Sequence, residues 1–581
     1  MPATSTPFPA PPRRWLRADF DATSEAAVAS ACDQLLALPL ADASALESWL
    51  LDVDELESAL EAAETRARIA ATRDTTDPAA RARHLQIQQR LLPFVRPRLD
   101  ALDRHFLAAP ARDGLPAERW AVLERLKTNR ATLYRPANVP LVSREAELLQ
   151  RHDEHLGGLL VAFRGERHTP QAMARFLDHP DRATREEAFR ALTAARLTLA
   201  DVLSDLFEEL LALRRELAAN AGLPGYRDYR FREMERFDYG PAECEAFAVA
   251  IEEQVVPVVC ELREARRRAL GLAQLRPWDL VVDPAGLPPL RPFRTADELA
   301  ALGERLLRRV DPELGSQFAF LREAGQLDLA NRPGKAPGGY NATLHDVRLP
   351  FIFANAVGLQ NDVRTLLHEA GHAFHTLACR DQPVVSYRHA PMEFCEVASM
   401  TMELLAAEHY AAGYSAADAA RARRQQLEHS LALLPWVATI DSFQHWLYTY
   451  PEHTRSERAA YWTALRMRFE PDVDWSGHME WLAVEWQRQL HLFRHPFYYI
   501  EYGMAQVGAL QIWLNARHQG RPAVEAYRQA LALGGSRPLP ELFTAAHACF
   551  DFGPAMLGTL ARAVRDALGE AERVPVETLR P

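Results

Sequence analysis

The sequence lacks the marks of a membrane or secreted protein. No stretch of 18 or more consecutive apolar residues occurs, so we expect no membrane-spanning helix. The first residues, MPATSTPFPAPPRRW, have no apolar core behind their charges, so we expect no secretory signal. The six cysteines are dispersed and form no C-x-x-C pair, a usage typical of reduced thiols. These absences predict a cytoplasmic protein.

The sequence also lacks a long basic stripe, and its formal net charge is −11. We therefore expect no nucleic-acid partner. Hydrophobic residues make up 48% of the 581 residues and charged residues 25%, values typical of a globular chain that buries a large core. Disorder of the whole chain is thereby excluded.

Helical periodicity dominates the chain after a proline-rich segment, residues 1–20, which we predict to be a flexible arm. Over residues 21–110, apolar residues recur at steps of three and four, the spacing of one buried helix face. The clearest set is Leu46, Trp49, Leu50, Val53, Leu56 and Leu60. The same period returns over 141–222 and 240–272.

Two segments interrupt this pattern. Residues 274–296 contain five prolines and predict an irregular loop or a small strand unit, followed by a helix from about Thr295 to Arg309. Residues 326–362 carry alternating bulky residues bounded by glycine and proline, which indicate strands. Helices are expected from there to about residue 570. The prediction is a mainly α protein with one small β patch.

Directly after the β patch comes an H-E-x-x-H motif, His368-Glu369-Ala-Gly-His372. On a helix, residues four apart lie one above the other, so the two histidines can bind one metal ion. Glu369 lies one step round the helix, where it can reach a water at the metal without being a ligand. Apolar flanks can bury the rest of the helix: Leu366, Leu367, Ala370, Ala373 and Leu377.

A catalytic zinc site needs a third protein ligand and one open position. A metzincin would continue with glycine and histidine where His375 and Ala378 stand, so that class is excluded. A thermolysin-like enzyme would place a glutamate where Met392 stands. The segment that follows offers Glu393, Glu396 and Glu403, which share one helix face, so one can bind metal while another supports a histidine. Spacing alone does not choose between Glu393 and Glu396.

Several separated motifs resemble the oligoendopeptidase F branch of the thimet-oligopeptidase family of zinc metallopeptidases. The resemblance is good over about residues 190–560. The matching segments are H-E-A-G-H-A-F-H at 368–375, E-V-A-S at 396–399, K-A-P-G-G-Y at 335–340, P-F-I-F-A-N at 350–355, W-D-L at 278–280, D-S-F-Q-H-W-L-Y at 441–448 and H-P-F-Y-Y-I-E-Y-G-M-A at 495–505. It implies a large helical, gluzincin-type body with a small β patch, split by a deep substrate channel.

The resemblance also implies roles near the motif. It makes Glu396, 24 residues after His372, the third ligand of one Zn²⁺ per chain. Glu403 resembles the family's supporting carboxylate, which orients a ligand histidine. For His375 we expect a packed supporting role, since a fourth protein ligand would close the site to water.

The downstream aromatic segment is the second half of the site in this family. The resemblance assigns His491, Tyr498 and Tyr502 to stabilising the tetrahedral intermediate. His495 is the alternative to His491, and Tyr499 is the alternative to Tyr498. Because Tyr498 and Tyr502 are four residues apart, one helix could aim both at the substrate.

Substrate contacts are expected upstream of the motif. The run 350–355, including Ala354 and Asn355, could present an open strand edge that pairs with the peptide backbone. Gly338 and Gly339 would let that backbone approach closely.

The predicted function is therefore hydrolysis of internal bonds of short unstructured peptides by a zinc-activated water, with Glu369 as general base. The predicted regions are the arm 1–20, an N-terminal helical region 21–185 and a catalytic region 186–581. Two alternatives stay open: a dipeptidyl carboxypeptidase of the angiotensin-converting-enzyme type, and a peptide-binding scaffold without chemistry. The sequence leaves the oligomeric state open.

Overall fold

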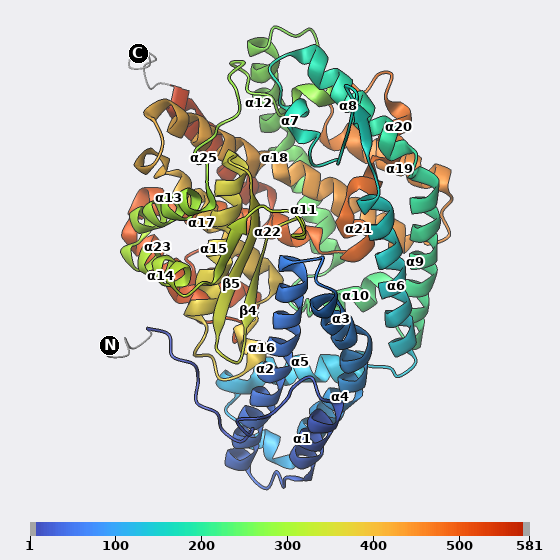
Figure 1. Cartoon of the computed structure of the whole chain (residues 1–581), viewed down its shortest axis with the longest axis vertical. Helices are drawn as coiled ribbons and strands as arrows, with labels where there is room; N and C mark the ends of the chain where they lie inside the picture. The colour runs from blue at the N-terminus through green and yellow to red at the C-terminus, as the bar shows by residue number, and fades with distance from the viewer. Residues whose placement is uncertain (1–6, 573–581) are drawn as a thin grey trace. The chain divides into compact units, whose positions relative to one another are not determined.

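The described residues, 7–572, are mostly helical in a computed structural model and include two small sheets (Figure 1). The mainly α prediction is confirmed. The chain divides into two compact units of interleaved segments. Unit 1 comprises the described residues up to Pro136 together with Arg291–Ala419 and Gly508–Phe550, and unit 2 comprises Ala137–Leu290, Ala420–Val507 and the described residues from Asp551 onward.

Unit 1 holds the H-E-x-x-H motif. Its helices are α1 (Glu25–Ala37), α2 (Ala43–Arg73), α3 (Pro78–Gln86), α4 (Leu92–Ala108), α5 (Ala117–Leu133), α13 (Ala296–Val310), α14 (Pro312–Glu323), α15 (Gln360–Ala378), α16 (Val385–Arg388), α17 (Met392–Ala407), α23 (Arg521–Ala532) and α24 (Leu539–Ala545), with short turns η1 (Ile87–Leu91), η2 (Pro110–Gly114) and η4 (Tyr410–Ala412). The predicted apolar face of α2 is buried from Leu46 to Leu60 against α1, α4 and α5. Thr295 caps α13 by accepting a hydrogen bond from the Glu298 amide, so the helix predicted there is confirmed.

A three-stranded sheet in unit 1 lies beside α15 (Figure 1). Its strands are β3 (Leu327–Ala330), β4 (Tyr340–Leu344) and β5 (Leu349–Ala356), in the order β3-β5-β4. Strand β5 pairs in parallel with β3 and antiparallel with β4, where Tyr340 faces Phe353 and Leu344 faces Leu349. The strands predicted within 326–362 are confirmed.

The prediction that residues 350–355 form an open strand edge is wrong for residues 350–353. Strand β5 is the central strand of its sheet, and β4 covers it from Leu349 to Phe353. Pro350 to Ala354 are all buried, so both faces of this strand are covered as well. The edge strand next to the motif helix is β4.

Unit 2 is also helical. Its helices are α6 (Asn138–Gly157), α7 (Ala174–Leu177), α8 (Arg182–Leu197), α9 (Ala200–Asn220), α10 (Tyr226–Glu233), α11 (Pro241–Gln254), α12 (Val256–Ala269), α19 (Arg455–Phe469), α20 (Met479–Val484), α21 (Leu490–Arg494) and α25 (Pro554–Glu572), with short turns η3 (Pro277–Asp279) and η5 (Glu485–Arg488). Helices α18 (Ala416–Thr449) and α22 (Tyr499–Gln519) contribute residues to both units.

One element of unit 2 was not predicted. A short antiparallel hairpin, β1 (Val161–Phe163) and β2 (Glu166–His168), interrupts the helical period expected over 141–222. Arg164 and Gly165 form its turn, both with positive φ, at 52° and 82°. Two-residue hairpins need this left-handed geometry, and glycine supplies it without strain.

The predicted arm 1–20 falls partly on residues 1–6, which lie outside the described residues. Residues 7–20 contain no helix or strand. The amides of Trp15 and Leu16 donate to the Glu55 carboxylate on α2, at 2.9 and 3.1 Å. The division into regions 21–185 and 186–581 stays a prediction. Within residues 7–572, no helix combines the length and the apolar character needed to cross a bilayer.

Candidate metal centre

Helix α15 carries both histidines of the motif. The Asp362 carboxylate caps its N-terminus by accepting hydrogen bonds from the amides of Val357 and Leu359, at 2.8 and 2.9 Å. One turn apart, the rings of His368 and His372 lie with centroids 4.9 Å apart and planes at 86°. The helix thus presents two imidazoles side by side, as the motif predicted.

Helix α17 brings a carboxylate to these rings. Oε2 of Glu396 lies 3.3 Å from Nε2 of His368 and 3.7 Å from Nε2 of His372. One ligand atom from each of the three residues lies within 4.8 Å of the others. Glu393 is on the same helix but is not part of this group. The choice that spacing left open therefore falls on Glu396.

Close packing of the two helices makes this convergence possible. Gly371 sits in the middle of α15, where a Cβ atom would lie 2.6 Å from the Ala398 carbonyl oxygen and 2.6 Å from the Ser399 Cα. Those distances are too short for any side chain, so only glycine permits the observed separation. Ser399 also orients this carboxylate, because its hydroxyl donates to Oε2 of Glu396 at 3.1 Å.

Glu403 supports His368 from the side away from Glu396. Its Oε1 lies 2.7 Å from Nδ1 of His368. Burial acts to lower the pKa of His368, but the hydrogen bonds and charges of Glu396 and Glu403 outweigh it and raise that pKa well above its usual value. Because Glu403 holds a proton on Nδ1, the other ring nitrogen, Nε2, is the one that points at His372 and Glu396.

The donor set suits zinc. Two imidazoles and one carboxylate are the three-ligand set of many catalytic zinc sites, and they leave a fourth position for water. Burial lowers the pKa of His372 to about 4, so that this imidazole is neutral and its lone pair is available near pH 7. The Glu396 side chain is only 5% exposed, whereas those of His368 and His372 are 21% and 18% exposed and so leave an open side for water.

Glu369 lies beside these candidate ligands and next to the edge strand. Its side chain is buried, and this desolvation raises the pKa of its carboxyl to about 7. The Asn341 backbone of β4 donates a hydrogen bond to that carboxyl. A Cβ atom on Gly339 would lie 3.8 Å from Oε1 of Glu369 and 3.1 Å from a Thr365 methyl group, so the backbone before β4 approaches the carboxylate closely.

The loop that leads into β4 is held by side chains from the sheet. The Asn355 amide group donates to the carbonyl oxygens of Ala336 and Gly338, both at 2.8 Å. The fully buried Lys335 ammonium donates to the Ala354 carbonyl at 2.5 Å and to the Asp328 carboxylate at 2.9 Å. Of the predicted substrate residues, Asn355 and Ala354 thus position the loop.

His375 lies one turn beyond His372 and is outside the group of metal-binding atoms. It is buried, and its ring packs edge-on against Phe394 with centroids 6.0 Å apart. Burial lowers its pKa to about 3, so the ring is neutral. In the described part of the chain, its Nε2 has no hydrogen-bond partner.

The aromatic residues predicted downstream form a second cluster, in unit 2. The His491 ring lies 5.8 Å from the ring of Tyr498 and 5.8 Å from that of Tyr502, and the two tyrosine rings are 5.3 Å apart. Nε2 of Gln489 lies 2.7 Å from Nδ1 of His491 and fixes the ring's orientation. The three predicted residues are thus neighbours.

The helix expected to carry both tyrosines begins later than predicted. Helix α22 starts at Tyr499, so Tyr498 lies just before it, and Phe497 has a positive φ of 64°. This bend turns the chain and still brings Tyr498 to Tyr502. The alternatives are close as well, since Tyr499 lies 5.0 Å and His495 6.1 Å from the His491 ring.

Sequence reasoning missed Gly371, Ser399 and Lys335. A glycine inside a helix costs roughly 1 kcal/mol relative to alanine, so Gly371 within the motif was a readable signal of close helix packing. Ser399 and Lys335 gave no such signal, because their roles depend on neighbours that only the fold supplies.

Comparison with known proteins relates the chain to peptidases. Residues 175–561 match Peptidase family M3. An oligoendopeptidase F homolog of Borreliella burgdorferi is 25% identical over 304 residues, which make up 49% of this chain and 49% of that relative. The chain therefore matches about half the length of the curated relative.

Solved structures match more of the chain. PZ peptidase A with inhibitor 2 superposes with a TM-score of 0.88 and 25% identity, covering 96% of this chain and 99% of the other. A structure named for oligoendopeptidase F gives a TM-score of 0.87 and 27% identity, covering 96% and 98%.

Proposed function

The chain belongs to Peptidase family M3, and on that premise we propose that it is a zinc-dependent endopeptidase that hydrolyses internal bonds of short unstructured peptides. Its mainly helical, zincin-type fold agrees with the solved structures of its neighbours. One observation carries the proposal: ligand atoms of His368, His372 and Glu396 lie within 4.8 Å of one another. This geometry supports one Zn²⁺ per chain.

A zinc ion at these residues would supply Lewis-acid activation of water and polarisation of the scissile carbonyl. Glu369 is the proposed general base. It accepts the proton of the attacking water and later passes it to the leaving amine. Its burial and a pKa raised to about 7 suit both transfers near neutral pH, since a catalytic pKa near the working pH is the most effective.

Strand β4 is the proposed docking edge for the peptide. It is the outer strand of its sheet, and the Asn341 amide already points at Glu369. A peptide added to this edge would form backbone hydrogen bonds that tolerate many side chains. Gly338 and Gly339 keep the approach free of side chains, and Gly338 has a φ of 98° that favours glycine.

The cluster of His491, Tyr498 and Tyr502 is proposed to donate hydrogen bonds to the oxyanion of the tetrahedral intermediate. Its support is the family resemblance together with the mutual contact of the three rings. The deep substrate channel of the family fold, which would exclude folded proteins, stays part of the proposal.

Digestion of short peptides with and without a chelator tests the proposed function. We expect an internally quenched peptide of about ten residues to be cut, the activity to stop on chelation and to return with Zn²⁺, and folded proteins to be spared. Mass spectrometry should find internal cleavage, and a C-terminally amidated peptide should be cut equally well. Failure on the amidated peptide would favour a dipeptidyl carboxypeptidase. Zinc binding without any cleavage would favour a peptide-binding scaffold.

A further inference from the structure

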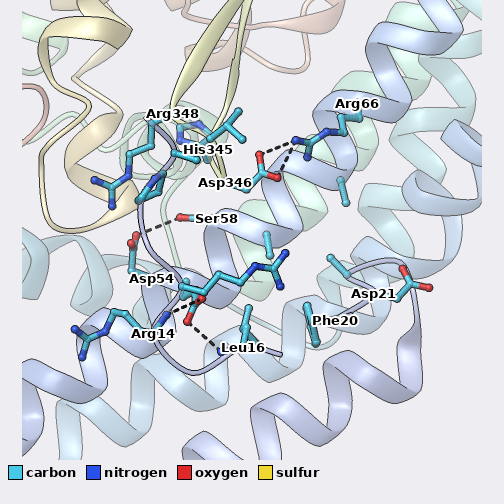
Figure 2. Close-up of a pocket in the computed structure, with 18 of the residues that line it drawn as sticks. Arg14, Leu16, Phe20, Asp21, Asp54, Ser58, Arg66, His345, Asp346 and Arg348 are labelled. Carbon is cyan, nitrogen blue, oxygen red and sulfur yellow. Dashed lines mark hydrogen bonds and ion pairs between the residues drawn. The ribbon is translucent and has the colours of Figure 1, made fainter. Parts of the chain in front are cut away.

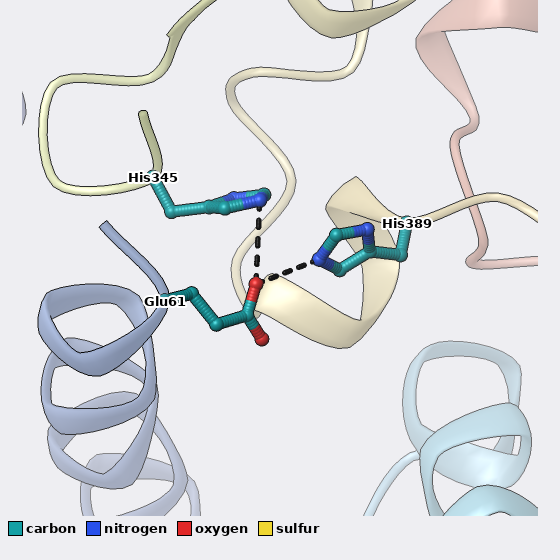
Figure 3. Close-up of side chains that lie close together, drawn as sticks. All are labelled: Glu61, His345 and His389. Carbon is teal, nitrogen blue, oxygen red and sulfur yellow. Dashed lines mark hydrogen bonds and ion pairs between the residues drawn. The ribbon is translucent and has the colours of Figure 1, made fainter. Parts of the chain in front are cut away.

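A second set of histidines and a carboxylate converges in unit 1, away from the motif helix (Figure 3). Glu61 projects from α2, His345 follows the last residue of β4, and His389 follows α16. Oε2 of Glu61 lies 2.8 Å from Nε2 of His389 and 3.3 Å from Nε2 of His345. Figure 3 shows both imidazoles directed at the same carboxylate oxygen.

The donor atoms are spaced as a metal site requires. One ligand atom from each residue lies within 4.8 Å of the others. Tetrahedral zinc with bonds of 2.0–2.1 Å separates its ligand atoms by about 3.3 Å. The observed distances from the Glu61 oxygen to the two imidazole nitrogens, 2.8 and 3.3 Å, are close to this spacing, and small side-chain shifts can make up the difference. The donor set, two imidazoles and a carboxylate, is the same as at the motif.

The rings are arranged for ligation. His345 is 3% exposed, and its Nδ1 has no hydrogen-bond partner within the described residues, so Nε2 is the nitrogen that faces the cluster. Packing holds the two imidazoles together with centroids 4.6 Å apart. A metal ligand must be held in one orientation, and burial of His345 provides this.

Two of the three side chains in the cluster are open to solvent. The side chains of His389 and Glu61 are 56% and 41% exposed, which leaves room for a water as fourth ligand. A cavity of about 530 Å³ borders His345 and its neighbour Asp346 (Figure 2). An ion can therefore enter without unfolding the site.

Two nearby arginines, Arg388 and Arg348, have hydrogen-bond partners of their own outside the cluster. The Arg388 guanidinium donates to Asp54 at 2.9 Å and to Ser58 at 2.7 Å. Arg348 donates to the Arg380 carbonyl oxygen at 2.8 Å. The alternative cluster of Cys244, Asp441 and His445 in unit 2 is less suited to a cation, because the Arg227 guanidinium lies 3.5 Å from Nδ1 of His445.

We propose that Glu61, His345 and His389 bind a second divalent transition-metal ion of the zinc class. The three ligands come from α2, from the turn after β4 and from the end of α16. The ion would therefore link α2 and α16 to the end of β4 that precedes His345. Asn341, near the other end of this strand, contacts Glu369 through its backbone amide. Its role is to hold that strand in place, and it takes no part in the chemistry.

Zinc content is the direct test. Full-length protein is stripped with a chelator, dialysed against micromolar Zn²⁺ and analysed for zinc by mass spectrometry. We expect two equivalents in the wild type, one in His389→Ala and one in Glu61→Gln. His518→Ala, a change at an exposed histidine of α22, is the matched control and should keep two. Equal zinc content in the wild type and in both cluster variants would overturn the proposal.

A His372→Ala background separates this site from the proposed catalytic one. In that background we expect one equivalent and a melting temperature that rises with added Zn²⁺. Adding His389→Ala should abolish both effects. If the proposed catalytic zinc is wrong but the second site is right, the wild type binds one ion and His389→Ala binds none. If the single mutant His372→Ala binds no zinc, the second site does not exist.

Discussion

Nδ1 of His368 lies 2.7 Å from Oε1 of Glu403, on the opposite side of the ring from Glu396. This pairing of a buried carboxylate with a histidine fixes which nitrogen carries the proton. Nε2 is thereby left to face the proposed metal ion. The first prediction concerns this pair.

Glu403→Gln should weaken zinc binding without abolishing it. Glutamine keeps the size but loses the charge that holds the proton on Nδ1, so we expect affinity to fall roughly 10- to 100-fold. Competition against a chromophoric chelator measures the dissociation constant. Glu393→Gln on the same helix is the control and should leave affinity unchanged. An equal loss in both variants would mean that general charge on α17, and not the Glu403 contact, supports the site.

Glu369→Gln should separate catalysis from metal binding. Glutamine cannot accept the water's proton, so we expect kcat to fall roughly 10²- to 10⁴-fold while zinc content persists. Glu323→Gln, at an exposed position at the end of α14, is the control and should keep full activity. Loss of zinc in Glu369→Gln would show that Glu369 is a ligand.

The same carboxyl predicts the acid limb of the pH profile. Glu369 must be ionised to act as a base, and burial raises its pKa to about 7. The positive charge of a bound zinc acts in the opposite direction, so kcat/KM should rise with pH and level off at or below about pH 7. In Glu369→Gln the residual activity should lack this limb. A wild-type profile that is flat from pH 5 to 8 would contradict the role.

Gly371→Ala should displace α17 from α15. The new Cβ would lie 2.6 Å from two backbone atoms, so the helices must separate and carry Glu396 away from the histidines. We expect a loss of about 1–3 kcal/mol in stability together with weaker zinc binding. Gly569→Ala in α25 meets no atom within 4 Å and is the control, with a small gain in stability expected. Full zinc affinity in Gly371→Ala would refute the packing argument.

Asn355→Asp should loosen the loop before β4. Aspartate cannot donate the two hydrogen bonds that reach the Ala336 and Gly338 carbonyls. We expect KM for a peptide to rise several-fold and kcat to change less, because the loop borders the proposed docking edge. The control is Asn361→Asp, where the side-chain oxygen accepts from Arg364 and aspartate can do the same. An unchanged KM would place the loop outside the substrate path.

His152 predicts a loss of stability in mild acid. It is fully buried against Phe493, and burial lowers its pKa to about 4 from an unfolded value of 6.5. Below pH 6.5 the unfolded chain binds a proton that the folded chain does not, so this contribution is complete above pH 6.5 and is lost as pH falls toward 4. The slope is about 1.4 kcal/mol per pH unit. Urea unfolding at several pH values should show a shallower slope in His152→Leu, and an identical slope would exclude this group.

Helices and strands could be predicted from the sequence because they depend on local periodicity and on the prolines and glycines that interrupt it. The apolar steps from Leu46 to Leu60 indicated a buried helix face, and the five prolines of 274–296 indicated a break. The turn at Arg164 and Gly165 was missed, because a single glycine after a charged residue is a weak hairpin signal. The order of the strands was not readable either, since an apolar run fits a central strand and an edge strand equally well.

The sequence by itself determined the motif histidines, because residues four apart on one helix must lie together whatever the rest of the chain does. Spacing could not choose between Glu393 and Glu396, and the family resemblance only implied Glu396 and Glu403; the tertiary structure places Glu396 beside both histidines, pairs Glu403 with His368 and requires glycine at position 371. The physical reason is that these relationships join two helices. Their distance and rotation follow from packing across the whole core, which no local pattern encodes.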